Sequence, residues 1–168
     1  MTFPRVAWCG VAVVALHNAE EALTIPTWLP SRLARLEAEF RIQPVAADTG
    51  RLYWGLAAAT LIPMIWVALA SRSAPRSIGP YSIIVLYGVF LANALVPHLL
   101  GTVLLASYVP GAITAGVLVV PFTVWLARRA VADGYATKPG LLAALLIAAA
   151  LYVPLLRALL GLPGLAAE

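Results

Sequence analysis

The sequence predicts an all-helical integral membrane protein, a bundle of five membrane-spanning helices with one short amphipathic helix at the membrane surface. Charged residues make up 11% of the chain, less than half of the roughly 25% that soluble domains carry. Hydrophobic residues make up 62% of the chain, and they gather in runs close to the ~20 residues that a helix needs to cross a membrane. These observations predict one membrane domain over residues 1–168.

The expected spans are separated by connections that contain arginine, proline and glycine. In chain order, the five spans are expected at residues 6–25, 52–70, 81–105, 111–127 and 139–160. Four spans contain an internal proline, which removes a backbone hydrogen bond. These prolines are Pro63, Pro97, Pro121 and Pro154. They predict kinks, which are either ordinary features of membrane helices or a means of opening the bundle around a cavity.

Residues 31–40 predict the surface helix. Ser31 is a suitable N-cap, and Leu33, Leu36 and Phe40 recur at helical spacing with charged residues between them. The segment is too short and too charged to cross a membrane. We therefore expect an amphipathic helix lying at the membrane surface.

Two pairs of small residues predict close helix packing. Gly88 and Ala92 lie four positions apart on the third span, and Ala112 and Gly116 do so on the fourth. Such pairs let helix backbones approach closely in membranes. We expect each pair to face a neighbouring helix.

The basic residues favour a cytoplasmic N-terminus. Six of them lie on the side that the N-terminus shares with the connections at 71–80 and 128–138, and five lie on the opposite side. Basic residues are enriched on the cytoplasmic side of membrane proteins. The net charge of +4 suits anionic lipid head groups. We expect membrane lipids as partners and no nucleic acid, because the basic residues do not cluster with aromatic residues on a polar face. A homo-oligomer remains open.

Three ionisable residues interrupt the first expected span. Successive helical residues turn by about 100°, so Glu20 and Glu21 fall near −60° and +40° from His17 and share one face with it. A charged residue at the centre of a membrane helix costs about 2.5 kcal/mol or more, so such residues face the protein interior and mark function. We expect His17, Glu20 and Glu21 to line a functional site.

The third expected span supplies two further candidates, Asn93 and His98. At roughly 1.5 Å per residue, His17 lies about 16 Å from the start of its span, Asn93 about 18 Å and His98 about 25 Å. The two spans run in the same direction, so all five polar residues occupy one layer of the membrane. Asn93 and His98 are about 140° apart on an ideal helix. Their convergence therefore requires the Pro97 kink, a broad cavity or a shorter reach from Asn93.

These residues resemble the signature of the HXXEE-motif family, small membrane proteins of bacteria. The matching residues lie in three stretches, His17-x-x-Glu20-Glu21, Asn93-x4-His98 and Tyr108-x-Pro110-Gly111-x2-Thr114. The resemblance covers the chain from the first span into the fourth. It implies a multi-pass protein of the bacterial inner membrane and carries no activity with it, since the family is uncharacterised.

Metal binding is the first chemistry that the cluster could support. His17 with Glu20 or Glu21 forms a ligand pair on one helix, and His98 adds a ligand from another. Two histidines and a carboxylate form a common open site for zinc or non-haem iron. The remaining glutamate would serve as an acid–base group, and Asn93 would orient the substrate or a ligand by hydrogen bonding.

Three other roles remain open. Two adjacent carboxyl groups in an apolar layer cannot both ionise cheaply, so a protonated Glu20 or Glu21 could act as an acid without metal. For the metal-dependent enzyme and for the metal-free one, the expected substrate is a lipid-like or isoprenoid molecule. Transport or sensing coupled to protons or metal ions would also use a histidine–glutamate relay. Finally, the cluster could be a structural polar network that joins the first span to the third.

Overall fold

The computed structural model describes residues 1–40 and 49–160, in which every regular element is a helix. Residues 41–48 and 161–168 of the expected single domain lie outside the described residues. The helices are α1 (Phe3–Trp28), α2 (Leu33–Phe40), α3 (Thr49–Ala70), α4 (Ile78–Asn93), α5 (Gly101–Leu105), α6 (Ala112–Thr114), α7 (Val120–Ala132) and α8 (Lys138–Leu160). The all-helical fold class is therefore confirmed, and a helix follows Ser31 as predicted.

Four described segments are long and apolar enough to cross a membrane, which indicates a membrane protein. They are Gly50–Ala70, Ile78–Leu105, Ala112–Ala132 and Lys138–Leu155. The prediction of five spans is wrong in its count, because α1 is not among these segments. With 26 residues α1 is long enough, but Arg5 and the polar residues around His17 lower its mean hydropathy. The prediction counted α1 as a fifth span because it considered only the length of the apolar run at residues 6–25.

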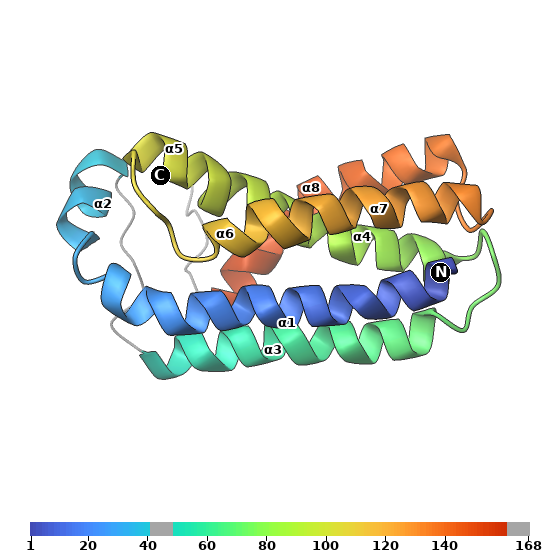
Figure 1. Ribbon diagram of the computed structural model, residues 1–168, viewed down its shortest axis with the longest axis horizontal. Coiled ribbons are helices and arrows are strands. Elements are labelled where there is room, and N and C mark those ends of the chain that lie inside the picture. Colours follow the sequence, from blue (N-terminus) through green and yellow to red (C-terminus); the bar gives the residue numbers. More distant parts are fainter. Residues whose placement is uncertain (41–48, 161–168) are drawn as a thin grey trace.

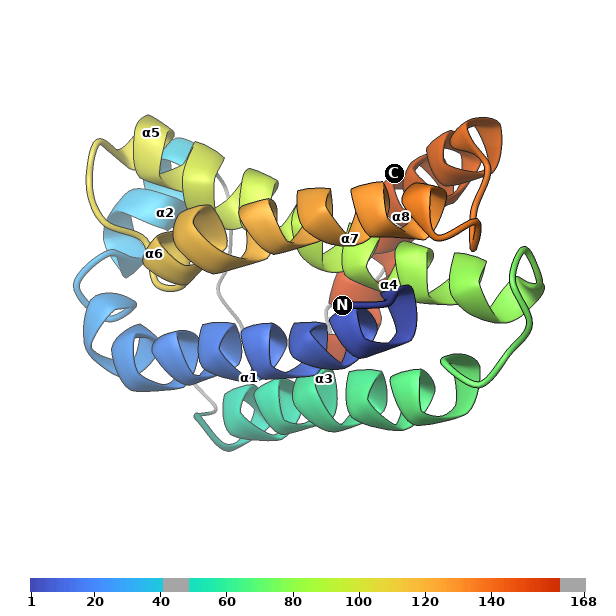
Figure 2. The ribbon, with the colours of Figure 1, turned by 45° about the vertical axis from the view of Figure 1, so that its right-hand side comes forward.

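The long helices run lengthwise beside one another (Figure 1). Helix α1 lies along α3 and contacts α7, and α4 packs against α8 (Figures 1 and 2). The N-terminus and the connections at 71–77 and 133–137 lie at one end of the bundle. Two hydrogen bonds join them there, from the Phe3 amide to Asp133 Oδ2 at 2.7 Å and from the Arg76 amide to the Tyr135 carbonyl at 3.1 Å.

The apolar core fills the half of the bundle near the N-terminus. Val6, Ile83, Tyr87 and Leu126 are almost fully buried there, on α1, α4 and α7. The Tyr87 hydroxyl donates a 2.6 Å hydrogen bond to the carbonyl of Ala7. This bond fixes α4 against α1 and satisfies a buried polar group. His17, Glu21 and His98 lie outside this apolar cluster.

Two long helices contain π-helical segments. Segment η1 (Ala94–Leu100) joins α4 to α5 and contains Pro97, and η2 (Ala115–Val119) joins α6 to α7 immediately before Val120 and Pro121. A proline lacks the N–H that an α-helix would use, and π-helical turns accommodate such interruptions and often occur at functional sites. Pro63 and Pro154 lie inside α3 and α8, which are α-helical throughout.

Candidate functional site

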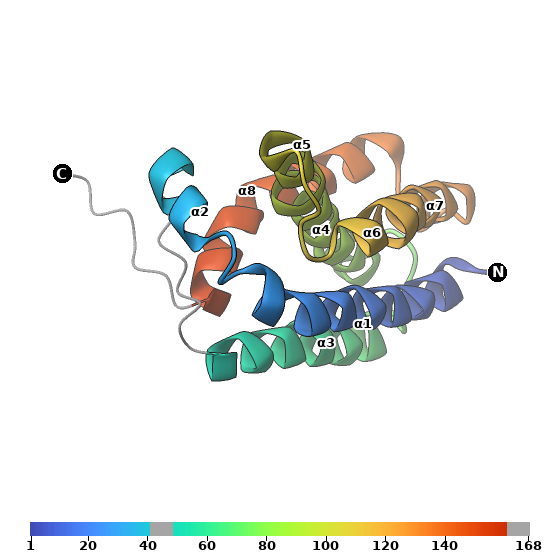
Figure 3. The same cartoon turned by 60° about the vertical axis from the view of Figure 1, so that its left-hand side comes forward.

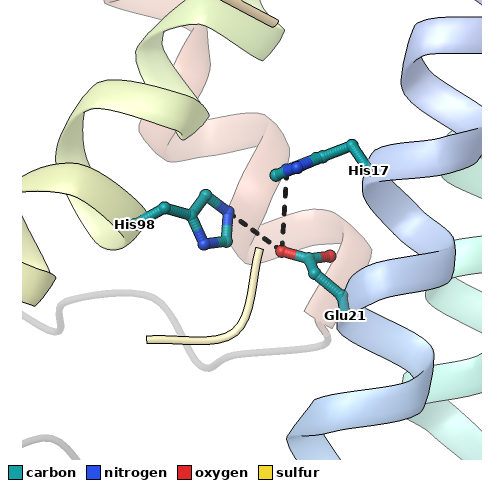
Figure 4. Close-up of side chains that lie close together, drawn as sticks. All are labelled: His17, Glu21 and His98. Carbon is teal, nitrogen blue, oxygen red and sulfur yellow. Dashed lines mark ion pairs between the residues drawn. The ribbon is translucent and has the colours of Figure 1, made fainter. Parts of the chain in front are cut away.

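Three side chains from two helices direct their ligand atoms toward one point (Figure 4). Nε2 of His98 lies 2.9 Å from Oε1 of Glu21, and Nε2 of His17 lies 3.8 Å from the same oxygen. The three ligand atoms all lie within 4.8 Å of one another. The exposed fraction is 1% for His17 and 5% for His98, so the histidines are shielded from solvent. We call these three residues the His–Glu cluster.

The α-helical geometry of α1 explains one half of the cluster. His17 and Glu21 are four residues apart, which places their side chains one above the other on the same face. That face points toward η1, where His98 follows Pro97. The sequence thus places two ligands by helical spacing and the third by the depth of His98 in its own helix.

The π-helical geometry of η1 explains how Asn93 reaches the cluster. Its Nδ2 lies 2.9 Å from Nε2 of His98 and 3.4 Å from Nε2 of His17. A π-helical turn closes between residues five positions apart, and Asn93 and His98 have this spacing. The Tyr152 hydroxyl of α8 donates a 3.1 Å hydrogen bond to Asn93 Oδ1. This bond orients the amide so that its NH₂ group faces the two histidines.

Glu20 lies next to the cluster but has a different set of partners. Its carboxylate accepts hydrogen bonds from the Tyr108 hydroxyl at 2.6 Å and from the amide of Thr114 at 2.8 Å. It also accepts a 2.5 Å bond from the Thr114 hydroxyl and a 3.3 Å bond from the amide of Ile113. Among the described residues, the group able to hold a metal comprises the His–Glu cluster and not Glu20.

The position of Glu20 follows from how α6 begins. The first amides of a helix have no partner within the helix, and the residue before it normally supplies an acceptor from its side chain. That residue is Gly111, which has no side chain and adopts φ +83°. Glu20 of α1 supplies the acceptor instead, which joins α1 to α6. Figures 1 and 3 show these two helices side by side.

The Nδ1 atom of each histidine has an oxygen partner outside the cluster. Nδ1 of His98 lies 2.5 Å from the carbonyl of Pro110. A carbonyl can only accept, so we assign the ring proton of His98 to Nδ1. Nδ1 of His17 lies 2.8 Å from Thr114 Oγ1. Both Nε2 atoms face Glu21.

The connection from Tyr108 to Thr114 forms one wall of the site. A Cβ atom added to Gly111 would lie 2.8 Å from Nδ1 and Cε1 of His98 and 3.0 Å from Cε1 of His17. Only glycine allows this approach. The sequence shows the stretch Tyr108-x-Pro110-Gly111-x2-Thr114 as part of the family pattern. Composition and spacing did not predict that Pro110 and Gly111 contact the two histidines.

The end of α1 is attached to the same connection, because the Trp28 indole donates a 2.6 Å hydrogen bond to the carbonyl of Tyr108. Nearby, Arg35 Nη1 of α2 donates a 3.0 Å bond to the carbonyl of Leu105 at the end of α5. Burial raises the pKa of the Tyr108 hydroxyl, and so does the hydrogen bond that it donates to Glu20. The phenol therefore stays protonated at neutral pH and remains a donor to Glu20.

Asn18, which borders the motif, belongs to a different contact. Its side chain is buried and donates hydrogen bonds to Thr60 Oγ1 at 2.8 Å and to the carbonyl of Leu56 at 3.3 Å. Both partners lie on α3. Asn18 therefore joins α1 to α3, a helix that contributes no residue to the His–Glu cluster.

Comparison with known proteins agrees with the motif. The family model described as "Protein of unknown function with HXXEE motif" matches residues 8–126. "Uncharacterized protein YrkK" of Bacillus subtilis (strain 168) is 28% identical over 109 residues, which are 64% of this chain and 63% of that protein. The alignment thus covers less than two thirds of the relative. No solved structure matches the chain. The family model spans more than half of the sequence and includes the His–Glu cluster, so the chain belongs to the HXXEE-motif family.

Proposed function

We propose that the protein is an intramembrane enzyme that binds one divalent metal ion at His17, Glu21 and His98 and acts on a lipid-like substrate. One observation carries the proposal. The Nε2 atoms of two buried histidines face a carboxylate oxygen, while each Nδ1 atom has a separate oxygen partner. Metal-binding histidines commonly have this arrangement, in which the second nitrogen donates to a carbonyl or another oxygen.

The distances between the three ligand atoms support a metal. Two ligand atoms at about 2.0–2.2 Å from one zinc ion lie roughly 3.4 Å apart. The distances within the cluster range from 2.9 Å to at most 4.8 Å, so small side-chain movements would bring all three to one ion. Two imidazoles and a carboxylate suit zinc or non-haem iron and leave a coordination position open.

The surrounding residues support catalysis at such a site. A metal of this kind lowers the pKa of bound water and polarises a substrate oxygen. Asn93 directs its NH₂ group toward the cluster, where it would position an oxygen of the substrate. Glu20 has four hydrogen bonds, so its role in our proposal is to support the site.

The apolar surroundings support the substrate class. Leu95 and Leu100 of η1 have exposed apolar side chains close in sequence to His98, as does Leu16 of α1 beside His17. Such surfaces suit contact with lipid tails, so a substrate would arrive from the membrane. We further propose the inner membrane of a bacterium as the location, with the N-terminus in the cytoplasm. The four apolar segments long enough to cross a membrane, the bacterial source of the similar protein and the distribution of basic residues support this placement.

The 2.9 Å contact between Glu21 and His98 also favours a second candidate, acid–base catalysis without metal. Here one proton lies between the two groups, and Glu21 delivers it to the substrate. The substrate class is the same. The two candidates differ in whether a metal is needed.

Metal analysis separates these candidates. The protein would be purified in detergent, treated with a chelator and titrated with zinc or ferrous iron. We expect one ion per chain in the wild type and none in His17→Ala or His98→Ala. Thr123→Val is the matched control, because Thr123 is a buried polar residue of α7 that bonds to the carbonyl of Val119. A wild type that binds neither ion would contradict the metal proposal.

Activity is tested with a membrane lipid extract. The extract would be incubated with the metal-loaded protein and analysed by mass spectrometry. We expect a lipid to be converted by the wild type and by Thr123→Val, but not by His98→Ala. Conversion by chelator-treated wild type would favour acid–base catalysis. No conversion under any condition would leave the cluster a binding or structural site.

A further inference from the structure

We infer that Glu20 and Thr114 form a positioning pair that sets the tautomer of His17, with the proton on Nδ1 and the lone pair of Nε2 directed at the cluster. The inference rests on the proposed function, because it states how this chain prepares one of the proposed ligands. It also explains why the motif contains two glutamates. Glu21 enters the cluster, and Glu20 acts through Thr114.

The direction of the hydrogen bonds follows from the Thr114 hydroxyl, which has one proton and three oxygen or nitrogen neighbours. The carboxylate of Glu20 lies 2.5 Å away, Nδ1 of His17 lies 2.8 Å away and the carbonyl of Gly111 lies 3.3 Å away. An ionised carboxylate can only accept. At 2.5 Å the proton must lie between Thr114 and Glu20, since two oxygens without a proton would repel each other.

The tautomer of His17 follows from this direction. Since the Thr114 proton is directed at Glu20, Thr114 Oγ1 is an acceptor toward His17, and Nδ1 must donate. The neutral ring has one N–H, so Nε2 carries the lone pair. The amide of Asn93 agrees with this assignment, because its Nδ2 donor lies 3.4 Å from the same Nε2 atom.

The carboxylate of Glu20 is held in place by groups other than Thr114 Oγ1. The amides of Ile113 and Thr114 and the hydroxyl of Tyr108 all donate to it. Replacing the Thr114 hydroxyl with a methyl group therefore leaves three donors to Glu20. The junction between α1 and α6 should survive, while His17 loses its acceptor.

His98 provides an internal control within the same protein. Its Nδ1 donates to the backbone carbonyl of Pro110, which no side-chain substitution removes. Thr114→Val should thus change the tautomer of His17 and leave that of His98 unchanged. A general loosening of the site would alter both rings.

The test uses the full chain in detergent with ¹⁵N-labelled histidine. The protein contains two histidines, so single His17→Gln and His98→Gln variants assign the signals. The ¹⁵N shifts of Nδ1 and Nε2 report the tautomer directly. We expect both rings to carry the proton on Nδ1 in the wild type. In Thr114→Val, His17 should shift toward the Nε2–H form, and Thr114→Ser should restore the wild-type signal.

Metal titration of the same variants gives the second readout. Loss of an outer hydrogen-bond partner commonly lowers metal affinity by about 10- to 100-fold. We expect a loss in this range for Thr114→Val and near wild-type affinity for Thr114→Ser.

Two outcomes would overturn the inference. The first is a wild-type spectrum with the His17 proton on Nε2, which needs no variant. The second is a Thr114→Val protein with an unchanged His17 signal. If the signal changes as expected but the wild type binds no metal, the positioning pair stands and the proposed metal site fails.

Discussion

Gly111 lies against His98 so closely that a single added Cβ atom would come within 2.8 Å of the imidazole. The same atom would lie 3.0 Å from the ring of His17. The backbone of Gly111, which has φ +83°, therefore lies against both histidines, and the carbonyl of the preceding Pro110 is the partner of Nδ1 of His98. One glycine in a connection thus helps to set the shape of a site formed by two helices.

Gly111→Ala should damage the site through collision with the histidines. An L-residue at positive φ costs roughly 1–2 kcal/mol by itself, so a control must carry the same strain. Gly134 has φ +75° and no atom within 4 Å of an added Cβ, which makes Gly134→Ala a matched variant. We expect both to lower the melting temperature in detergent, but only Gly111→Ala to lose metal binding. Equal metal binding in both variants would show that the approach of Gly111 is unimportant.

Asn93→Asp should strengthen a metal site. The substitution preserves the shape of the side chain and its ability to accept from Tyr152, but it replaces the NH₂ group near the two Nε2 atoms with an oxygen. Oxygen ligands suit divalent cations, so we expect at least a 10-fold gain in zinc affinity, measured by chelator competition. Without metal, we expect a lower melting temperature, because the added negative charge faces two nitrogen lone pairs and Glu21.

Asn93→Leu is the control for this charge effect, since it removes the NH₂ group without adding an oxygen. It should not gain affinity. If the cluster is only a structural network, Asn93→Asp should lower the melting temperature without any gain in zinc affinity. That result would contradict the prediction.

Asn18→Ala should separate stability from metal binding. The substitution removes a buried side chain that bonds to Thr60 and to the carbonyl of Leu56. A lost buried hydrogen bond costs about 1–3 kcal/mol, so the free energy of unfolding should fall by that amount. Metal affinity should remain within twofold of the wild type. The adjacent substitution His17→Ala should abolish metal binding with little loss of stability. If both variants lose stability and metal binding to the same extent, the two functions of α1 cannot be separated in this way.

The sequence predicted which residues meet better than it predicted how they meet. Hydrophobic runs identified the long helices. Helical spacing and a shared layer of the membrane identified His17, Glu20, Glu21 and His98 as candidates, but did not distinguish Glu21, which lies with the histidines, from Glu20. The number of membrane-spanning segments was wrong because α1 combines bundle length with polar residues that lower its hydropathy. A count based on apolar runs does not weigh these residues correctly.

The remaining details depend on contacts between distant parts of the chain. The angles on α1 place Glu20 and Glu21 on either side of His17, and they do not reveal that the helix beginning after Gly111 binds one of them. The approach of Asn93 to His98 depends on the π-helical segment η1, whereas an ideal α-helix would point them about 140° apart. Pro97 marked the place of this irregularity without determining its geometry.

Helix packing gives the last prediction. The small-residue pattern predicts close contact at Gly88 and at Gly116, but the structure places only the first in a tight interface. An added Cβ at Gly88 would lie 2.7 Å from Cβ of Ala148 and 3.3 Å from Leu145 on α8. At Gly116, which is exposed, the nearest atom is a terminal carbon of Leu99 at an ordinary 3.6 Å. The two glycines therefore form a matched pair.

Gly88→Leu should force α4 and α8 apart, because the larger side chain meets a neighbour that cannot yield. Overpacking of this kind costs about 1–3 kcal/mol or more, and we expect a clear fall in the melting temperature in detergent. Gly116→Leu should change the melting temperature little, since its side chain extends away from the bundle. Because Tyr152 of α8 orients Asn93, Gly88→Leu should also weaken metal binding. Equal melting temperatures for the two variants would contradict the close packing of α4 on α8.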